Sequence, residues 1–237
     1  MEHYRLKDKE RLVDADDFLP LLGTDHVEFY CGNAKQSAYY YQAALGFDLV
    51  DYAGPETGVR DRVSYVLSQN KLRFVLTSPL HSDSPIGEHV KKHGDGVKVL
   101  ALWVDDATSA FNETTKRGGQ PVMEPTTYED EDGKVVVSAI KTYGETIHKF
   151  VERKDYNGIF LPGFKHRKPF VQAESIGIEY VDHCVGNVEL GAMNEWVKFY
   201  EDVLGFSLLL TFDDEDISTE YSALMSKVVS NGNGYVK

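Results

Sequence analysis

Two histidines in this sequence each follow an aspartate at the start of an apolar stretch. They are His26 in Asp25-His26 and His183 in Asp182-His183. A neutral imidazole is a common metal ligand, and a strand would hold it rigidly toward one face of a sheet. A hydrogen-bonded core histidine is the alternative at each position. The residue types therefore indicate a metal ligand or a core contact, and symmetry does not choose between the two copies.

A second pair of histidines, His89 and His93, has the spacing that places two side chains on one helix face. Such a pair can hold a metal. However, Glu88 precedes the first histidine, whereas the zincin motif places its glutamate after it. No third ligand is apparent nearby in the sequence, so the pattern favours a pair on a helix surface.

Nucleophilic catalysis has little support, because of the two cysteines only Cys184 lies beside a histidine. Adjacent residues of a strand face opposite sides, so His183 would not activate that thiol. The acidic runs at 129–132 and 213–216 lack the spacing of a calcium loop and fit solvated turns. Metal chemistry remains the better hypothesis.

The composition excludes several classes of function. Acidic residues outnumber basic ones 38 to 25, which gives a net charge of -13 and disfavours nucleic acid and anionic membrane surfaces as partners. Two cysteines cannot form a disulfide framework, and no targeting segment is apparent. No apolar run approaches the ~18 residues that cross a bilayer. We therefore expect a cytoplasmic protein with no nucleic-acid and no membrane partner.

The segments that contain the two Asp-His pairs are copies of one unit. Asp182 lies 157 residues after Asp25, and Leu204-Gly205-Phe206 lies 159 residues after Leu45-Gly46-Phe47. In each copy a β-rich run precedes a helical stretch with its apolar residues on one face, and the glycine suits the left-handed end of a helix. The repeat predicts a duplicated β-α-β-β-β unit.

A third, more divergent unit lies between these two copies. The first unit continues with strands and a turn at Gln69-Asn70, and the middle unit has a helix at about 105–117 and a hairpin turn at Asp132-Gly133. From this order we expect an N-terminal domain of two modules at 1–155 and an interdomain linker at 156–175. Residues 176–237 would be the first module of a C-terminal domain that is truncated.

Four stretches of the chain resemble the 4-hydroxyphenylpyruvate dioxygenase family of the vicinal oxygen chelate superfamily. They are 93–97, 156–164, Asp182-His183 and 221–229. The likeness covers nearly the whole chain and corresponds to the N-terminal three-fifths of the family. It implies an α+β fold of tandem βαβββ modules that form an open barrel, with the second barrel only half present.

The resemblance also implies a metal site of which this chain supplies one ligand. The family holds Fe(II), one per complete catalytic domain, with two histidines and one glutamate. His183 matches the first histidine, while the other two ligands belong to the family's final unit. His26 is not a ligand in the family. Ser226 matches a substrate-binding serine, and Val228 matches an apolar residue of the pocket wall.

The implied reaction is the oxidative decarboxylation and ring hydroxylation of 4-hydroxyphenylpyruvate by O2 to give homogentisate, a step of tyrosine and phenylalanine catabolism. The family commonly forms homo-oligomers. The chain as given would be inactive alone, because it lacks two of three iron ligands. A hydroxymandelate synthase-like enzyme, which hydroxylates the side chain instead of the ring, and a non-catalytic truncated product remain as alternatives. The sequence does not separate them.

Overall fold

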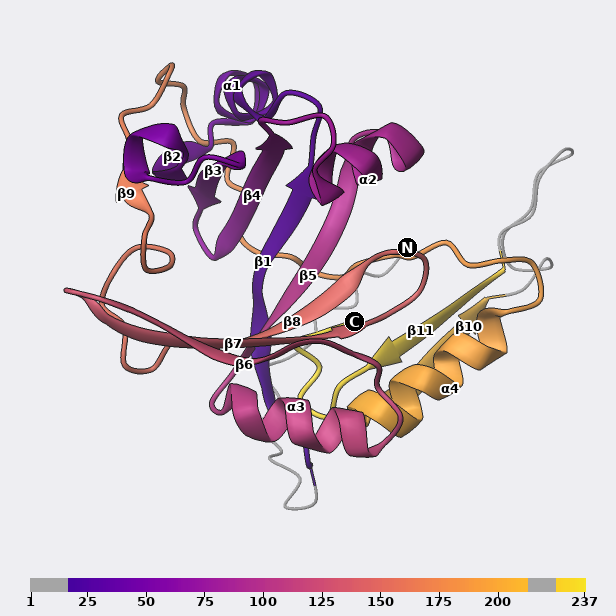
Figure 1. The fold of residues 1–237 in the computed structure, drawn as a ribbon. Helices are drawn as coiled ribbons and strands as arrows, with labels where there is room; N and C mark the ends of the chain where they lie inside the picture. The colour runs from indigo at the N-terminus through magenta and orange to yellow at the C-terminus, as the bar shows by residue number, and fades with distance from the viewer. Residues whose placement is uncertain (1–16, 213–224) are drawn as a thin grey trace, which may run out of the picture.

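A nine-stranded mixed sheet forms the centre of the computed structural model, which describes residues 17–212 and 225–237 (Figure 1). The strand order is β6-β7-β8-β5-β1-β4-β3-β2-β9. The strands of this sheet are β1 (Leu21–Tyr30), β2 (Asp48–Ala53), β3 (Arg62–Gln69), β4 (Leu72–Pro79), β5 (Gly96–Val104), β6 (Pro121–Asp130), β7 (Gly133–Lys141), β8 (Ile147–Glu152) and β9 (Lys165–His166). The helices are α1 (Ala34–Leu45), α2 (Pro85–His93), α3 (Ala107–Lys116) and α4 (Met193–Leu204), with a short 3-10 turn at Pro55–Thr57.

The sheet contains two β-α-β-β-β modules related by an internal symmetry. The first is β1-α1-β2-β3-β4 and the second is β5-α3-β6-β7-β8. In each module the first and last strands pair in parallel, β1 with β4 and β5 with β8, and the antiparallel pair β1–β5 joins the modules. The strand order is therefore mirrored about β1 and β5, which confirms the predicted duplication and the open-barrel fold.

The predicted helix ends are confirmed in both Asp-His copies. Helix α1 begins where the side chain of Asn33 accepts a hydrogen bond from the amide of Gln36 at 3.1 Å. It ends at Gly46 with φ of 67°, and α4 ends at Gly205 with φ of 71°. Glycine adopts this left-handed conformation without a Cβ clash, so each helix stops where the sequence predicted.

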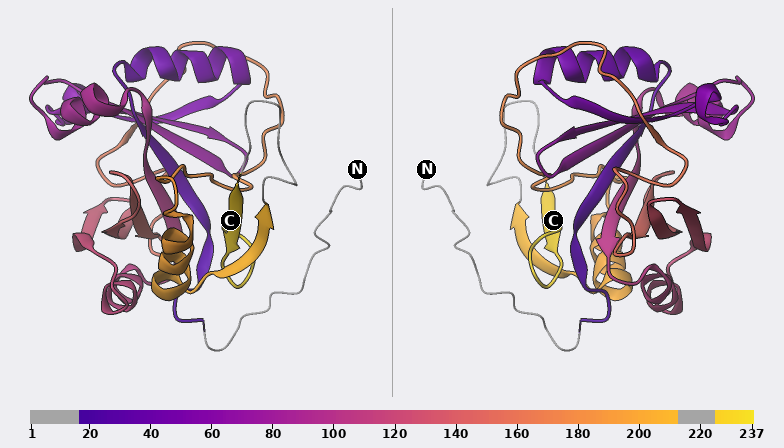
Figure 2. Two further views of the ribbon diagram at one scale, coloured as in Figure 1. Left: turned by 90° about the vertical axis from the view of Figure 1, so that its right-hand side faces the viewer. Right: turned by 90° about the vertical axis from the view of Figure 1, so that its left-hand side faces the viewer.

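Helices cover one face of the curved sheet, and the other face lines the barrel interior. Helix α1 packs on the first module and α3 on the second, at opposite ends of the sheet (Figures 1 and 2). The interior face is lined by small and β-branched side chains, and the linker residue Phe160 packs among them. These residues are Val66, Val75, Val99, Ala101, Val135, Val137 and Val151. Phe160 is only 2% exposed, so the linker fills part of the opening of the first barrel.

The third unit differs from the sequence prediction at its first strand. A two-stranded sheet of β10 (Ser207–Phe212) and β11 (Ser226–Ser230) follows α4, but 176–185 form no strand or helix. The expected strand at His183 was therefore wrong. One backbone hydrogen bond of 3.0 Å, from Cys184 N–H to the Lys237 carbonyl, joins this segment to the end of the chain, and a strand needs a longer ladder.

The third unit packs on the second module. Val203, Leu204 and Phe206 share one buried core with Leu102 and Phe150. Part of the stretch 221–229, which resembles the family in sequence, lies outside the described residues. The division into domains at 1–155, 156–175 and 176–237 stays a prediction.

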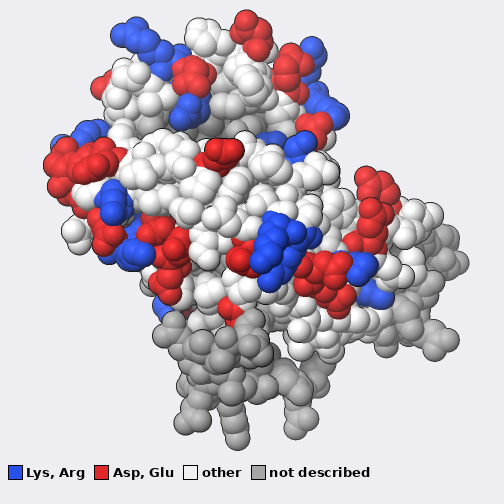
Figure 3. Space-filling view, turned by 60° about the horizontal axis from the view of Figure 1, so that its bottom comes forward, with Lys and Arg blue, Asp and Glu red and all other residues white. Residues whose placement is uncertain are grey.

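Acidic and basic side chains lie close together over the face shown in Figure 3, in clusters of mixed sign. Exposed ion pairs of the chain include Lys134–Asp155 and Lys165–Glu131. Among the described helices, none is long and apolar enough to span a membrane.

Candidate functional site

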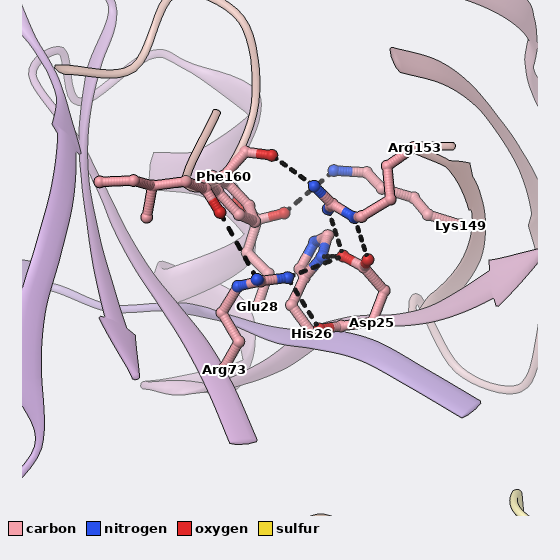
Figure 4. A network of polar contacts seen from close by, with 8 residues as sticks. Asp25, His26, Glu28, Arg73, Lys149, Arg153 and Phe160 are labelled. Atoms are coloured by element: carbon pink, nitrogen blue, oxygen red, sulfur yellow. Dashed lines mark hydrogen bonds and ion pairs between the residues drawn. The ribbon is translucent and has the colours of Figure 1, made fainter. Parts of the chain in front are cut away.

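The first Asp-His pair lies in a buried network of charges inside the first barrel (Figure 4). The Asp25 carboxylate accepts hydrogen bonds from Nδ1 of His26 at 2.6 Å and from the Arg153 guanidinium at 2.6 and 2.8 Å. Arg73 lies 3.8 Å from the same carboxylate. Both oxygens of Asp25 are thus occupied by donors of the protein itself.

A second carboxylate, Glu28, completes this network on the same strand. It accepts hydrogen bonds from Lys149 at 3.1 Å and from the Thr77 hydroxyl at 2.9 Å. The parallel pairing of β5 with β8 brings Lys149 and Arg153 to the face of β1 that carries Glu28. Positions far apart in sequence therefore supply the cations that balance two buried carboxylates.

Protonation in this network favours a neutral imidazole. Burial lowers the pKa of His26, against the opposing effect of Asp25. Burial alone would raise the pKa of Asp25, but the hydrogen bond with His26 and the charge of Arg153 hold it below its usual value. The ring of Phe160 packs edge-on against His26 at 5.1 Å between centroids. Arginine, lysine and an aromatic ring occupy the surroundings where a metal would need further donors, so His26 is a structural residue.

The second Asp-His pair is exposed. The side chain of His183 is 57% exposed, and its Nδ1 lies 2.8 Å from the Asp182 carboxylate. Lys237 contacts the other oxygen of Asp182 at 3.4 Å. Because the carboxylate only accepts, Nδ1 carries the proton of the neutral ring and Nε2 keeps its lone pair. An aspartate that orients a histidine in this way is typical of the shell around a metal ligand.

The two other predicted site residues, Ser226 and Val228, lie on one face of β11. Lys227 between them donates to Asn194 of α4 at 2.6 Å, so strand alternation turns Ser226 and Val228 away from that helix. Val228 is paired with Leu210 of β10, which is 51% exposed. Among the described residues, no hydrogen bond or ion pair joins His183 to Ser226 or Val228, and their roles stay predictions.

The structure brings together a third group that the sequence did not reveal. His89 and His93 lie on one face of α2, as their spacing predicts, and Glu145 from the loop before β8 lies against both. Their ligand atoms are all within 4.8 Å of one another. The prediction of a simple surface pair was wrong, because His89 is 8% exposed and a third donor is present. Only the packing of α2 on β1 and β4, next to β5 in the sheet, could have revealed Glu145.

The fold and the order of its modules place the chain in a known class. The sequence profile of the Glyoxalase/Bleomycin resistance protein/Dioxygenase superfamily matches residues 23–144, which is about half of the chain. The chain belongs to this superfamily.

Within that superfamily, the curated proteins that are similar to this chain have names that state one and the same activity. The chain is 42% identical to a 4-hydroxyphenylpyruvate dioxygenase of Aspergillus fumigatus over 91% of its length. It is 43% identical to one of Caenorhabditis elegans over 90% of its length. It covers 58% of the first relative and 56% of the second, so it spans less than three-fifths of either protein.

A solved structure shows the same fold. A mutant of 4-hydroxymandelate synthase from Streptomyces coelicolor superposes with a TM-score of 0.78 over 92% of this chain and 62% of that one. Its sequence identity is 23%, so the likeness concerns the fold alone.

Proposed function

We propose that this chain is part of an Fe(II)-dependent 4-hydroxyphenylpyruvate dioxygenase that forms homogentisate in tyrosine and phenylalanine catabolism. The observation that carries the proposal is the identity of 39% to 43% with eight curated proteins of that name, each over at least 90% of this chain. Its substrates would be 4-hydroxyphenylpyruvate and O2. We expect the enzyme to be located in the cytoplasm and to form a homo-oligomer.

His183 fits the role of one iron ligand. Its ring is accessible, and Asp182 holds the tautomer that presents Nε2. Among the described residues, the group of three side chains that could hold a metal ion is elsewhere, at His89, His93 and Glu145. The two remaining ligands of the iron site would therefore come from sequence that follows the matched region in the relatives. Bound Fe(II) would supply the redox chemistry with O2.

The residues of this chain would then position and shield the substrate. Ser226 would donate or accept a hydrogen bond at the substrate, and Val228 with Leu210 would form an apolar wall that excludes water. These two roles need β10 and β11 to be covered on the face away from α4, where Leu210 is now 51% exposed. A pocket that removes water strengthens the polar contacts inside it.

A chimeric protein tests the proposal. Residues 1–237 would be joined to the portion of the Aspergillus fumigatus relative that follows the matched region, and O2 uptake and product would be measured with 4-hydroxyphenylpyruvate. We expect homogentisate. His183→Gln should reduce its formation to background, whereas the matched control His81→Gln, at an exposed loop histidine, should not.

Three results would count against the proposal. Hydroxymandelate as the product would favour side-chain hydroxylation. Full activity of the His183→Gln chimera would show that His183 is not an iron ligand. A folded, iron-loaded chimera with no O2 uptake would overturn the activity itself. Residues 1–237 alone should show no O2 uptake.

A further inference from the structure

Three potential metal ligands converge where α2 meets the loop between β7 and β8. Oε2 of Glu145 lies 3.0 Å from Nε2 of His93 and 3.6 Å from Nδ1 of His89. Zinc bonds to imidazole nitrogen and carboxylate oxygen at ~2.1 Å, which puts neighbouring ligands of a tetrahedral ion ~3.4 Å apart. The two separations from Glu145 are close to that value, and the ligand atoms of all three side chains lie within 4.8 Å of one another.

His89 provides an independent indication of a ligand. Its side chain is more than nine-tenths buried, and among the described residues its Nδ1 atom has no hydrogen-bond partner. Buried polar atoms are nearly always paired, so an orphaned nitrogen needs an explanation. The ring of Tyr30 packs edge-on against His89 at 5.4 Å and fixes its orientation. The unpaired nitrogen is directed at the carboxylate of Glu145, 3.6 Å away.

Burial and neighbouring charges favour the neutral ring of His89 and the ionised carboxylate of Glu145. Burial, followed by the charges of Lys98 and His93, lowers the pKa of His89, so its ring is neutral near pH 7. Hydrogen bonds from Lys92 and His93 lower the pKa of Glu145 to about 2, so its carboxylate is ionised. Lys92 binds Oε1 of Glu145 and leaves Oε2 to the histidines, while Lys98 binds the backbone carbonyl of Glu145.

We propose that His89, His93 and Glu145 form a binding site for a divalent transition-metal ion of the zinc type. Two imidazoles and one carboxylate suit such an ion, whereas Mg²⁺ and Ca²⁺ prefer oxygen ligands alone. An open pocket of about 570 Å³ adjoins the group and leaves a fourth position for water or a small ligand. The bound ion ties α2 to the loop before β8. Lys92 and Lys98 repel the ion, so the affinity is lower than that of a site without nearby cations.

The inference does not depend on the proposed dioxygenase function. The ligands lie on α2, between the two N-terminal modules, and in the loop before β8, and none is His183. The first test is a titration of chelator-treated protein, residues 1–237, with Zn²⁺ in competition with a chromogenic chelator. We expect one equivalent to bind. Substitution of Co²⁺ for Zn²⁺ should give the intense visible absorption of a four-coordinate site.

Two exposed ligands allow the site to be removed without disturbing the core. His93 and Glu145 have side chains that are 38% and 43% exposed, so His93→Gln and Glu145→Gln should keep the wild-type circular dichroism without metal. Each should weaken Zn²⁺ binding at least ~10-fold, as the loss of a ligand-shell contact does. The matched control His81→Gln, at an exposed loop histidine, should bind as the wild type does.

Thermal unfolding supplies a second measurement. Zn²⁺ binds only the folded site, so it should raise the Tm of the wild type in a concentration-dependent way and leave both site variants unchanged. Absence of Zn²⁺ binding, or equal affinity in wild type and Glu145→Gln, would overturn the site. Fe(II) binding that is lost in Glu145→Gln but kept in His183→Gln would assign the ion to the site at His89, His93 and Glu145. That result would not contradict the proposed dioxygenase function.

Discussion

The two Asp-His pairs have the same dipeptide and opposite environments. In both, the carboxylate accepts from Nδ1 of the following histidine, at 2.6 Å for Asp25-His26 and at 2.8 Å for Asp182-His183. Yet the His26 side chain is 2% exposed and the His183 side chain 57% exposed. The aspartate of the dipeptide therefore fixes the tautomer of the histidine ring. The residues around the pair decide whether Nε2 is accessible to a metal ion.

The neighbours that close the first pair come from distant parts of the chain. Arg153 follows β8 and binds both oxygens of Asp25, and Phe160 from the linker covers the ring of His26. Around His183 the described residues place Lys237, which contacts Asp182 rather than the ring. A guanidinium that pairs with the aspartate turns the first pair into a structural element, and the second remains open to chemistry.

The largest expected effect comes from breaking the buried pair. Asp25→Ala leaves the Arg153 charge buried without a partner, so the free energy of unfolding should fall by ~3 to 5 kcal/mol. Asp182→Ala, at an exposed carboxylate, should change it by no more than ~0.5 kcal/mol. Urea unfolding followed by circular dichroism measures both.

A double variant separates the buried charge from simple loss of packing. Asp25→Ala with Arg153→Met removes both members of the pair, and the apolar replacement should recover part of the lost stability. If the double variant is as unstable as the sum of its single variants, the Asp25–Arg153 coupling is absent. Similar losses of unfolding free energy in Asp25→Ala and Asp182→Ala would contradict the proposed difference between the two Asp-His pairs.

The pH dependence of stability tests a second buried histidine of the same domain. Burial lowers the pKa of His148 to about 4. Its Nε2 lies 2.9 Å from the Tyr200 hydroxyl and its Nδ1 lies 3.2 Å from the Leu100 carbonyl, which suits a neutral ring. As pH falls from about 6.5 toward 4, the unfolded chain takes up the proton first, so the folded state loses stability. The expected loss is ~3 kcal/mol.

The measurement is the free energy of unfolding between pH 4 and about 7. His148→Gln should flatten the curve in this window by removing this residue's share. His26 and His89, whose pKa values are also lowered, contribute slopes of the same sign, and Asp51, whose pKa burial raises to about 6, contributes one of the opposite sign. A curve of His148→Gln parallel to that of the wild type would show that the ring is not buried as a neutral group.

Local signals in the sequence predicted much of the fold. The glycines after α1 and α4 adopt the left-handed conformation, and the turns at Gln69-Asn70 and Asp132-Gly133 join the hairpins β3–β4 and β6–β7. Asn70 has φ of 50° and Gly133 has φ of 120°, so these turns are encoded by the residues themselves. The module order followed from the repeat of these signals.

The site depended on contacts that no local signal encodes. Glu145 reaches His93 across 52 residues, and Arg153 reaches Asp25 across 128. Both contacts follow from the order of β8, β5 and β1 in the sheet. The strand expected at His183 failed for a related reason, since alternation of side chains says nothing about whether a partner strand is beside it.

The smallest expected effect contrasts the glycines that end the two repeated helices. An added Cβ at Gly205 would lie 2.9 Å from the ring of Phe18, a side chain that can move, whereas at Gly46 it would lie 2.1 Å from the backbone oxygen of Glu174. Gly205→Ala should thus cost ~1 kcal/mol for the left-handed conformation. Gly46→Ala should cost about twice that, because the linker backbone must also shift. If urea unfolding shows the same loss of unfolding free energy for Gly46→Ala and Gly205→Ala, the backbone at 174–175 is not held in place against α1.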